Sequence, residues 1–455
     1  MSTIKRTVFV LQRLQLTPVK IPHLRWVIAA MLFLSTMINY ANRLSLSIVS
    51  RDLRAQFHMT EQDYSYVLTA FFVAYAIMYA GSGYLVDRLG TRRGFAAFIA
   101  TWSIAAMLHA VVVGKWSLGA VRFLLGLGEP GNWPAAAKAV GEWFPASQRA
   151  LGVGIFNAGS SLGSAIAPPL LAYLTLSYGW RFAFATTGAM GLLWLVAWLI
   201  LYQPPHRNRF LSAEEYVRIK NEVQPPAETT AAQRIDWRRV IGMRECYTLI
   251  LARFLTDPVI YFVIFWLPEY LRKERGFDLQ MVGRYAWMPF IVGDVGYILG
   301  GWLSGRLMRA GWQLPSARKF VMLLGAVIMP AAIVAPLVPA AWMAIAATCC
   351  ITFGHAFFVS NIQTLPTDLF RGNEVGTASG FSGMGGAVGG ILANLGTGYV
   401  VQHFSYAPVF FMAGLLHPVA IALVYRLLPN SYFRASEPAP GLPPAYSGPA
   451  GNRNT

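Results

Sequence analysis

Long apolar stretches recur along nearly the whole chain, and they restrict its possible folds more than any other feature. Each stretch is about 20 residues long, which lets an α-helix cross a hydrocarbon core roughly 30 Å thick. The sequence therefore predicts an all-α membrane protein. We expect twelve transmembrane helices, at residues 26–50, 64–85, 94–113, 116–140, 150–175, 181–202, 247–271, 284–308, 319–338, 342–365, 375–401 and 407–428.

The composition excludes an ordinary soluble enzyme. Hydrophobic residues make up 55% of the chain and charged residues only 13%, about half the charged share of a typical soluble protein. The three cysteines have no metal-ligand spacing, and we find no phosphate-binding or nucleophile motif. We therefore expect no enzymatic activity, no cofactor and no bound metal.

The net charge of +17 is explained by membrane topology. If both termini are cytoplasmic, 26 of the 37 Lys and Arg residues lie on the cytoplasmic side, 8 on the opposite side and 3 within spans. This distribution follows the positive-inside rule, so it requires no nucleic-acid partner. The first 25 residues contain five Lys or Arg and no apolar core, which argues against a cleaved signal peptide.

The chain divides into two halves of six spans each. We predict a cytoplasmic N-terminal segment at 1–25, a six-helix bundle at 26–202, a cytoplasmic central loop at 203–246, a second bundle at 247–428 and a disordered cytoplasmic tail at 429–455. The segment GYLVDRL at 83–89 aligns with GWLSGRL at 301–307, which indicates duplication and pseudo-symmetric bundles. In such a protein a substrate site is expected between the halves, near the bilayer midplane.

Two arginines within the spans are candidates for binding an anion. A charge at the bilayer centre costs between about 3 and more than 10 kcal/mol, so such residues should face water or each other. Counting about 1.5 Å per residue, Arg43 and Arg122 lie at similar depths in different helices. Together they could bind a carboxylate. The alternatives are that Arg43 extends to the outer surface and that Arg122 belongs to a structural ion pair.

Three acidic residues and a third arginine complete the set of intramembrane charges. Glu129 lies seven residues after Arg122, in a segment whose Gly and Pro residues favour bending. A glutamate that faces water and a closed cavity in turn can take up and release a proton; the alternative is a permanent ion pair with Arg122. Asp294 is a second candidate for proton coupling or for an internal pair, whereas the spacing of Arg253 and Asp257 predicts a structural salt bridge.

Polar residues at similar depths could recognise the hydroxyl groups of a polyhydroxylated acid, although each could instead join two helices. These candidates are Tyr40, Tyr75, Asn157, Ser160, Asn361, Gln363 and Asn394.

The segment GYLVDRLGTRR at 83–93 resembles the loop between spans two and three of the major facilitator superfamily. In this loop Asp87 can accept hydrogen bonds from a helix N-terminus, while Arg88 and Arg92 bridge to acids and form a breakable cytoplasmic latch. The alternative is a basic loop that only sets topology.

Further motifs resemble the anion:cation symporter group, in particular bacterial hexuronate and aldonate transporters. They are NYANR at 39–43, RFLLGLGE at 122–129, EWFP at 142–145, RFLTDP at 253–258, AWMP at 286–289 and FRGNEV at 370–375. The resemblance implies that Arg43 binds the substrate carboxylate beside Tyr40 and Tyr75, and that Glu129 carries the proton near Arg122. Many relatives have Asp where this chain has Asn42, and Asn cannot titrate.

We therefore predict a bacterial inner-membrane proton symporter for a sugar acid, with hexuronate favoured over galactonate because Ser160 replaces the Gln found in galactonate transporters. Its expected partners are the carboxylate substrate, protons and lipid, without nucleic acid or an obligate protein partner. The alternatives are an exchanger, a transporter of another carboxylate, and a membrane sensor that binds the acid without moving it.

Overall fold

The computed structural model describes residues 20–222, 236–278, 281, 284–370 and 372–433, and its regular secondary structure over these residues is helical. Parts of the predicted N-terminal segment (1–19), central loop (223–235) and disordered tail (434–455) lie outside the described residues.

Ten helical segments of the described chain are long and apolar enough to cross a membrane. They contain α2 (Leu24–Ile48), α4 (Glu61–Leu89), α5 (Thr91–Leu108) with η1 (His109–Val111), α8 (Ala146–Tyr178), α9 (Trp180–Leu201), α12 (Arg244–Arg275), α15 (Leu314–Ile328) with α16 (Ala331–Val334), α17 (Ala341–Ile362) with α18 (Leu365–Leu369), α19 (Val375–His403) and α20 (Ala407–Leu427).

The two other predicted spans are also helical, although they are more polar. The segment predicted at 116–140 consists of α6 (Lys115–Gly128), the turn η2 (Glu129–Gly131) and α7 (Asn132–Trp143). The segment predicted at 284–308 is α14 (Met288–Arg309). Glu129 and Asp294 lie in these two segments, so the helices that depart most from lipid-like composition carry the candidate proton sites.

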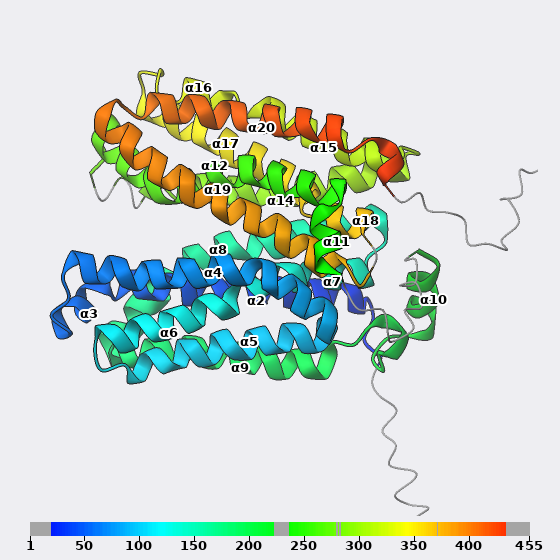
Figure 1. The fold of residues 1–455 in the computed structure, drawn as a ribbon, viewed down its shortest axis with the longest axis horizontal. Coiled ribbons are helices and arrows are strands. Elements are labelled where there is room, and N and C mark those ends of the chain that lie inside the picture. Colours follow the sequence, from blue (N-terminus) through cyan, green and yellow to red (C-terminus); the bar gives the residue numbers. More distant parts are fainter. Residues whose placement is uncertain (1–19, 223–235, 279–280, 282–283, 371, 434–455) are drawn as a thin grey trace, which may run out of the picture.

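The long helices form two bundles that lie side by side (Figure 1). Helices α2 to α9 make the N-terminal bundle, and α12 to α20 make the C-terminal bundle. The short elements are α3 (Ser50–Gln56), η3 (Pro205–Arg207), α10 (Ala213–Glu222), α11 (Trp237–Gly242) and η4 (Asn430–Tyr432). We call the end that carries α10, α11 and α18 the terminal end, because the described chain begins and finishes there.

The two bundles are in close contact where α4 meets α19. A Cβ atom added at Gly83 would lie 2.0 Å from the backbone oxygen of Gly376, so only glycine permits this approach. Large apolar side chains such as Val113, Trp116 and Leu176 are strongly exposed on the molecule, as expected for a surface covered by lipid. The fold thus places a tight seam between two lipid-facing bundles.

Candidate functional site

A break in the fourth span positions Glu129. Helix α6 ends at Gly128, and the η2 turn contains Pro130, which cannot donate a backbone hydrogen bond. A Cβ atom at Gly131 would lie 2.1 Å from the ring of Phe98, so glycine lets this turn pack directly on α5. Glu129 still has helical backbone angles and donates its backbone N–H to the Leu125 oxygen, so it lies on nearly the same face of α6 as Arg122 and begins the tighter turn.

An ion pair joins Arg43 of α2 to Glu129. The Arg43 Nε atom lies 2.8 Å from Glu129 Oε2, and the Glu129 side chain is fully buried, whereas that of Arg43 is 19% exposed. Asn39 supports both partners: its Nδ2 donates to the Glu129 backbone oxygen (3.3 Å), and its Oδ1 accepts from Arg43 Nη2 (3.4 Å). Arg43 therefore points into the protein and does not extend to the outer surface.

Arg122 lies behind this pair. Its Nη2 donates to the backbone oxygen of Arg43 (3.2 Å), and its side chain is buried. A permanent ion pair with Arg122 was the alternative role considered for Glu129, but the carboxylate pairs with Arg43. Seven residues separate Arg122 and Glu129 by about 10 Å along the helix axis, and Arg43 of the neighbouring α2 reaches the carboxylate instead. Arg122 can still stabilise negative charge here, because buried charges interact strongly over short distances.

Aromatic rings surround the Arg43 guanidinium. Its Cζ lies 4.9 Å from the centroid of Tyr40 and 4.7 Å from that of Tyr75, within the range of cation–π contacts. The Tyr75 hydroxyl accepts a hydrogen bond from Trp133 Nε1 (3.1 Å). Residues from three different helices thus hold the cation in place and leave hydroxyl groups beside it.

Two tyrosines of the C-terminal bundle also face this centre, and the sequence analysis missed both. Tyr261 of α12 lies within electrostatic range of Arg43, Tyr40 and Tyr75. Tyr297 of α14 lies similarly near Tyr40. A spacing signal was present, because Tyr261 follows the intramembrane Asp257 by four residues and Tyr297 follows Asp294 by three, which places each pair on one helix face.

Of the other polar residues predicted for the site, one pair crosses between the bundles and two residues have contacts within one bundle. Asn157 Nδ2 donates to Gln363 Oε1 at 2.8 Å, which links α8 to the residue after α17. Ser160, one turn further along α8, lies beside Tyr40. Asn394 is exposed and accepts a hydrogen bond from Trp266 Nε1 (2.6 Å), between α19 and α12.

Asn361 does not lie with these residues. Its side chain is fully buried, and its Nδ2 donates to the Gly300 backbone oxygen (3.2 Å) and to Ser360 Oγ (3.2 Å). Its Oδ1 faces Arg318 Nη1 at 3.5 Å. We therefore leave Asn361 out of the substrate site, because internal partners already use its amide.

The two other acids of the C-terminal bundle differ in their surroundings. Asp257 Oδ2 lies 2.5 Å from Arg253 Nη2, the intrahelical pair that the spacing predicts. Asp294 lies beside Ser161 of α8, and its Oδ1 has no hydrogen-bond partner among the described residues. Asp294 therefore remains a candidate for proton coupling, whereas Asp257 is held by a fixed cation.

Asp87 joins the bundles near the terminal end. It accepts from the backbone nitrogens of Gly376 (3.0 Å) and Thr377 (2.6 Å) in the first turn of α19, where the helix dipole favours an anion. Its cationic partner is Lys138 of α7, at 2.6 Å.

The predicted roles of the loop arginines need correction. Arg88 is exposed and forms no ion pair with a described residue, and Arg92 donates to the backbone oxygen of Leu199 within its own bundle. Arg88 faces outward and Arg92 is used within its own bundle, so Lys138 supplies the positive charge beside Asp87.

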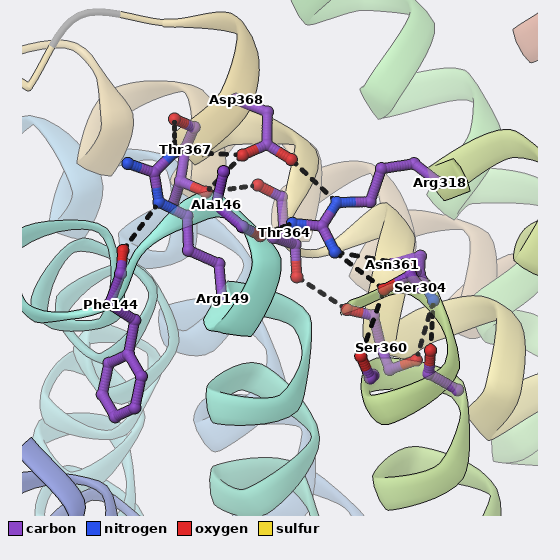
Figure 2. Close-up of polar contacts among 12 residues, drawn as sticks. Phe144, Ala146, Arg149, Ser304, Arg318, Ser360, Asn361, Thr364, Thr367 and Asp368 are labelled. Atoms are coloured by element: carbon purple, nitrogen blue, oxygen red, sulfur yellow. Dashed lines mark hydrogen bonds and ion pairs between the residues drawn. The ribbon is translucent and has the colours of Figure 1, made fainter. Parts of the chain in front are cut away.

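A second link between the bundles, absent from our sequence predictions, centres on Asp368 (Figure 2). Asp368 Oδ1 pairs with Arg149 of α8 at 3.1 Å, and its Oδ2 pairs with Arg318 of α15 at 2.9 Å. Arg318 also donates to the backbone oxygen of Ala146 (2.7 Å), at the start of α8. One buried carboxylate thus ties two arginines from different bundles together at the terminal end.

We expect Asp368→Asn to lower the melting temperature of the purified protein by several degrees. The substitution leaves Arg149 and Arg318 without their shared counter-charge, and removing one partner of a buried pair costs about 3 kcal/mol or more. Glu269→Gln is the matched control, because it breaks a pair with Lys273 that is largely exposed and contributes little. Equal melting temperatures for wild type and Asp368→Asn would contradict this assignment.

Within the described part of the chain, no three His, Cys, Asp or Glu side chains gather as metal ligands would. The central charges are instead arginine and carboxylate groups, which suit binding of an organic anion and transfer of a proton.

Comparisons with known proteins identify the family to which this chain belongs. The sequence matches the Major Facilitator Superfamily over residues 32–393 and 313–448. It is 33% identical over 413 residues to the hexuronate transporter of Escherichia coli strain K12, covering 90% of this chain and 95% of that protein. It is 34% identical over 311 residues to the galacturonate transporter of Dickeya chrysanthemi, covering 68% of this chain and 90% of that protein. The fold is similar to that of the proton:xylose symporter XylE, with a TM-score of 0.68 at 14% identity, covering 89% and 96% of the two chains.

Proposed function

Because the chain belongs to the Major Facilitator Superfamily, we propose that it imports a sugar acid with one carboxylate, a hexuronate, by symport with protons. The family consists of membrane transporters, and the relatives described above carry hexuronate and galacturonate by name. We extend the hexuronate substrates of these relatives to the present chain and add coupling to protons.

The observation that supports the proposal best is the ion pair between Arg43 and the fully buried Glu129. A guanidinium can bind a carboxylate through two parallel hydrogen bonds, and Glu129 already uses the Nε atom of Arg43. Nη1 has no hydrogen bond to a described residue and Nη2 has only the 3.4 Å contact with Asn39, so both are available to a second carboxylate.

This geometry couples the two solutes through competition for one cation. A proton that neutralises Glu129 weakens its attraction to Arg43, which then binds the substrate carboxylate more strongly. Loss of the proton restores the competition and favours substrate release. The hydroxyl groups of Tyr40, Tyr75 and Tyr261 surround the same cation and provide hydrogen-bond partners for the sugar ring.

Transport requires the seam between the bundles to open on each side in turn. At the terminal end, the Asp87 and Asp368 links join the two bundles. We propose that this end is cytoplasmic, since the side of the termini carries most of the Lys and Arg residues. Opening towards the cytoplasm then breaks both links, and in a bacterium the protein resides in the inner membrane.

Uptake of radiolabelled glucuronate or galacturonate into proteoliposomes tests the proposal. We expect an inward proton gradient to drive accumulation, and a protonophore to abolish it. Unlabelled galactonate, tartrate and benzoate serve as competitors that separate hexuronates from other carboxylates. Uptake that ignores the proton gradient, but depends on an anion inside the vesicle, would identify an exchanger.

A further inference from the structure

The charged groups around Arg43 determine how much charge a transport cycle moves, an inference that rests on the proposed function. Arg43 and Arg122 are positive, and Glu129 is the carboxylate that contacts this pair. With an empty site these three groups therefore carry a net charge of about +1, if each has its usual ionisation.

The other groups that face this centre add no exchangeable acid. Tyr40, Tyr75 and Tyr261 are phenols from α2, α4 and α12. His109, at the end of the third span, lies near Arg122 but is stacked on Phe184, and its Nδ1 donates to the backbone oxygen of Ala105.

Neither of the two intramembrane carboxyls of the opposite bundle pairs with Arg43. Asp257 is paired with Arg253, and Asp294 lies beside Ser161 and does not contact Arg43. Among the described residues, Glu129 is therefore the acid that a substrate carboxylate can replace at Arg43.

Asn42 occupies the position where a second acid would change this balance. It directly precedes Arg43, and it follows Asn39, which contacts Glu129, by nearly one helical turn. Its side chain is 1% exposed, and neither Oδ1 nor Nδ2 has a hydrogen-bond partner in the described structure. A buried amide without partners makes no internal contact that explains it, and it cannot carry a proton through the cycle.

We propose that Asn42 limits coupling to one proton for each monocarboxylate, so that transport is electroneutral. One proton neutralises Glu129 and one substrate carboxylate takes its place at Arg43, so the three groups and the bound substrate together keep the net charge of about +1. A diacid carried with one proton would instead move one negative charge. An inside-negative potential of about 100 mV would lower accumulation of that diacid roughly fiftyfold.

Proteoliposomes with a potassium gradient and valinomycin test this proposal, because they allow the membrane potential and the proton gradient to be set separately. For wild-type protein we expect glucuronate uptake to follow the proton gradient and to change less than about twofold with a potential of about 100 mV. For Asn42→Asp, which adds a titratable group, we expect an inside-negative potential to stimulate uptake. Asn42→Ser, a polar control that cannot titrate, should remain insensitive to potential.

The possible results separate this inference from the proposed function. Stimulation of wild-type uptake by the potential would overturn one-proton coupling and leave symport intact. If the potential then no longer stimulated uptake by Asp294→Asn, Asp294 would be the second proton site. An active Asn42→Asp that ignores the potential would show that Asn42 does not set the coupling. Uptake driven by neither gradient would overturn the proposed symport itself. The wild-type measurement decides electroneutrality even if Asn42→Asp does not fold.

Discussion

Arg43→Lys is expected to weaken glucuronate binding about 100-fold and to abolish measurable uptake. The guanidinium holds Glu129 through Nε while its Nη atoms stay available, whereas a lysine ammonium is a single point that cannot bridge two carboxylates in the same way. Loss of a charge-assisted hydrogen bond to the substrate is worth up to about 3 kcal/mol. Binding is measured on purified protein by isothermal titration calorimetry or thermal shift.

Arg181→Lys is the matched control for this substitution. Arg181 is exposed at the start of α9, where it stacks on Trp180 at 4.2 Å, far along the chain from the proposed site. This variant should bind and transport like wild type. Unchanged glucuronate affinity in Arg43→Lys, with the fold intact, would remove Arg43 from the substrate site.

Glu129→Gln is expected to retain counterflow and to lose accumulation driven by protons. Glutamine keeps the size and some hydrogen bonding of the protonated acid, but it cannot exchange a proton. Wild-type protein that couples one proton can accumulate substrate up to about tenfold for each unit of pH difference. The variant should only equilibrate labelled substrate across the vesicle membrane.

Glu269→Gln provides the control, because Glu269 forms an exposed pair with Lys273 at the end of α12. It should accumulate glucuronate as wild type does. Full accumulation by Glu129→Gln would place the proton site elsewhere, with Asp294 as the next candidate, because its Oδ1 has no partner among the described residues.

The sequence predicted the helices well because each span must be an apolar helix of about 20 residues to cross the lipid. Even the two least apolar spans, which hold Glu129 and Asp294, kept enough helical length to be recognised. The break at Glu129 was also foreseeable from the Pro and Gly residues around it. The pairing of Glu129 with Arg43 was not foreseeable, because it depends on how α2 packs beside the end of α6.

Ion pairs between segments far apart in the chain could not be predicted from the sequence. Arg149, Arg318 and Asp368 lie at or beyond the ends of predicted spans, where charged residues are usually solvated, yet Arg318 and the Asp368 side chain are fully buried. Only the docking of α8 against α15 and α18 makes them one cluster. In the same way, Lys138 lies near the end of the span predicted at 116–140, and the structure places it against Asp87.

The surroundings of Asp87 were predicted only in part. A loop acid near a helix N-terminus was expected from the motif, and the structure identifies α19 as that helix. The arginines of the motif were expected to complete the latch, but motif spacing does not say which cation lies on the buried side. Burial and distance had to decide between Arg88 and Lys138.

We propose that a substrate carboxylate and a proton together displace the Glu129 carboxylate from Arg43. The protons taken up when glucuronate binds to purified protein can be counted with a pH indicator in weakly buffered solution near neutral pH. We expect close to one proton per bound glucuronate for wild type, and close to none for Glu129→Gln. Wild-type binding without proton uptake, or equal uptake by Glu129→Gln, would contradict it.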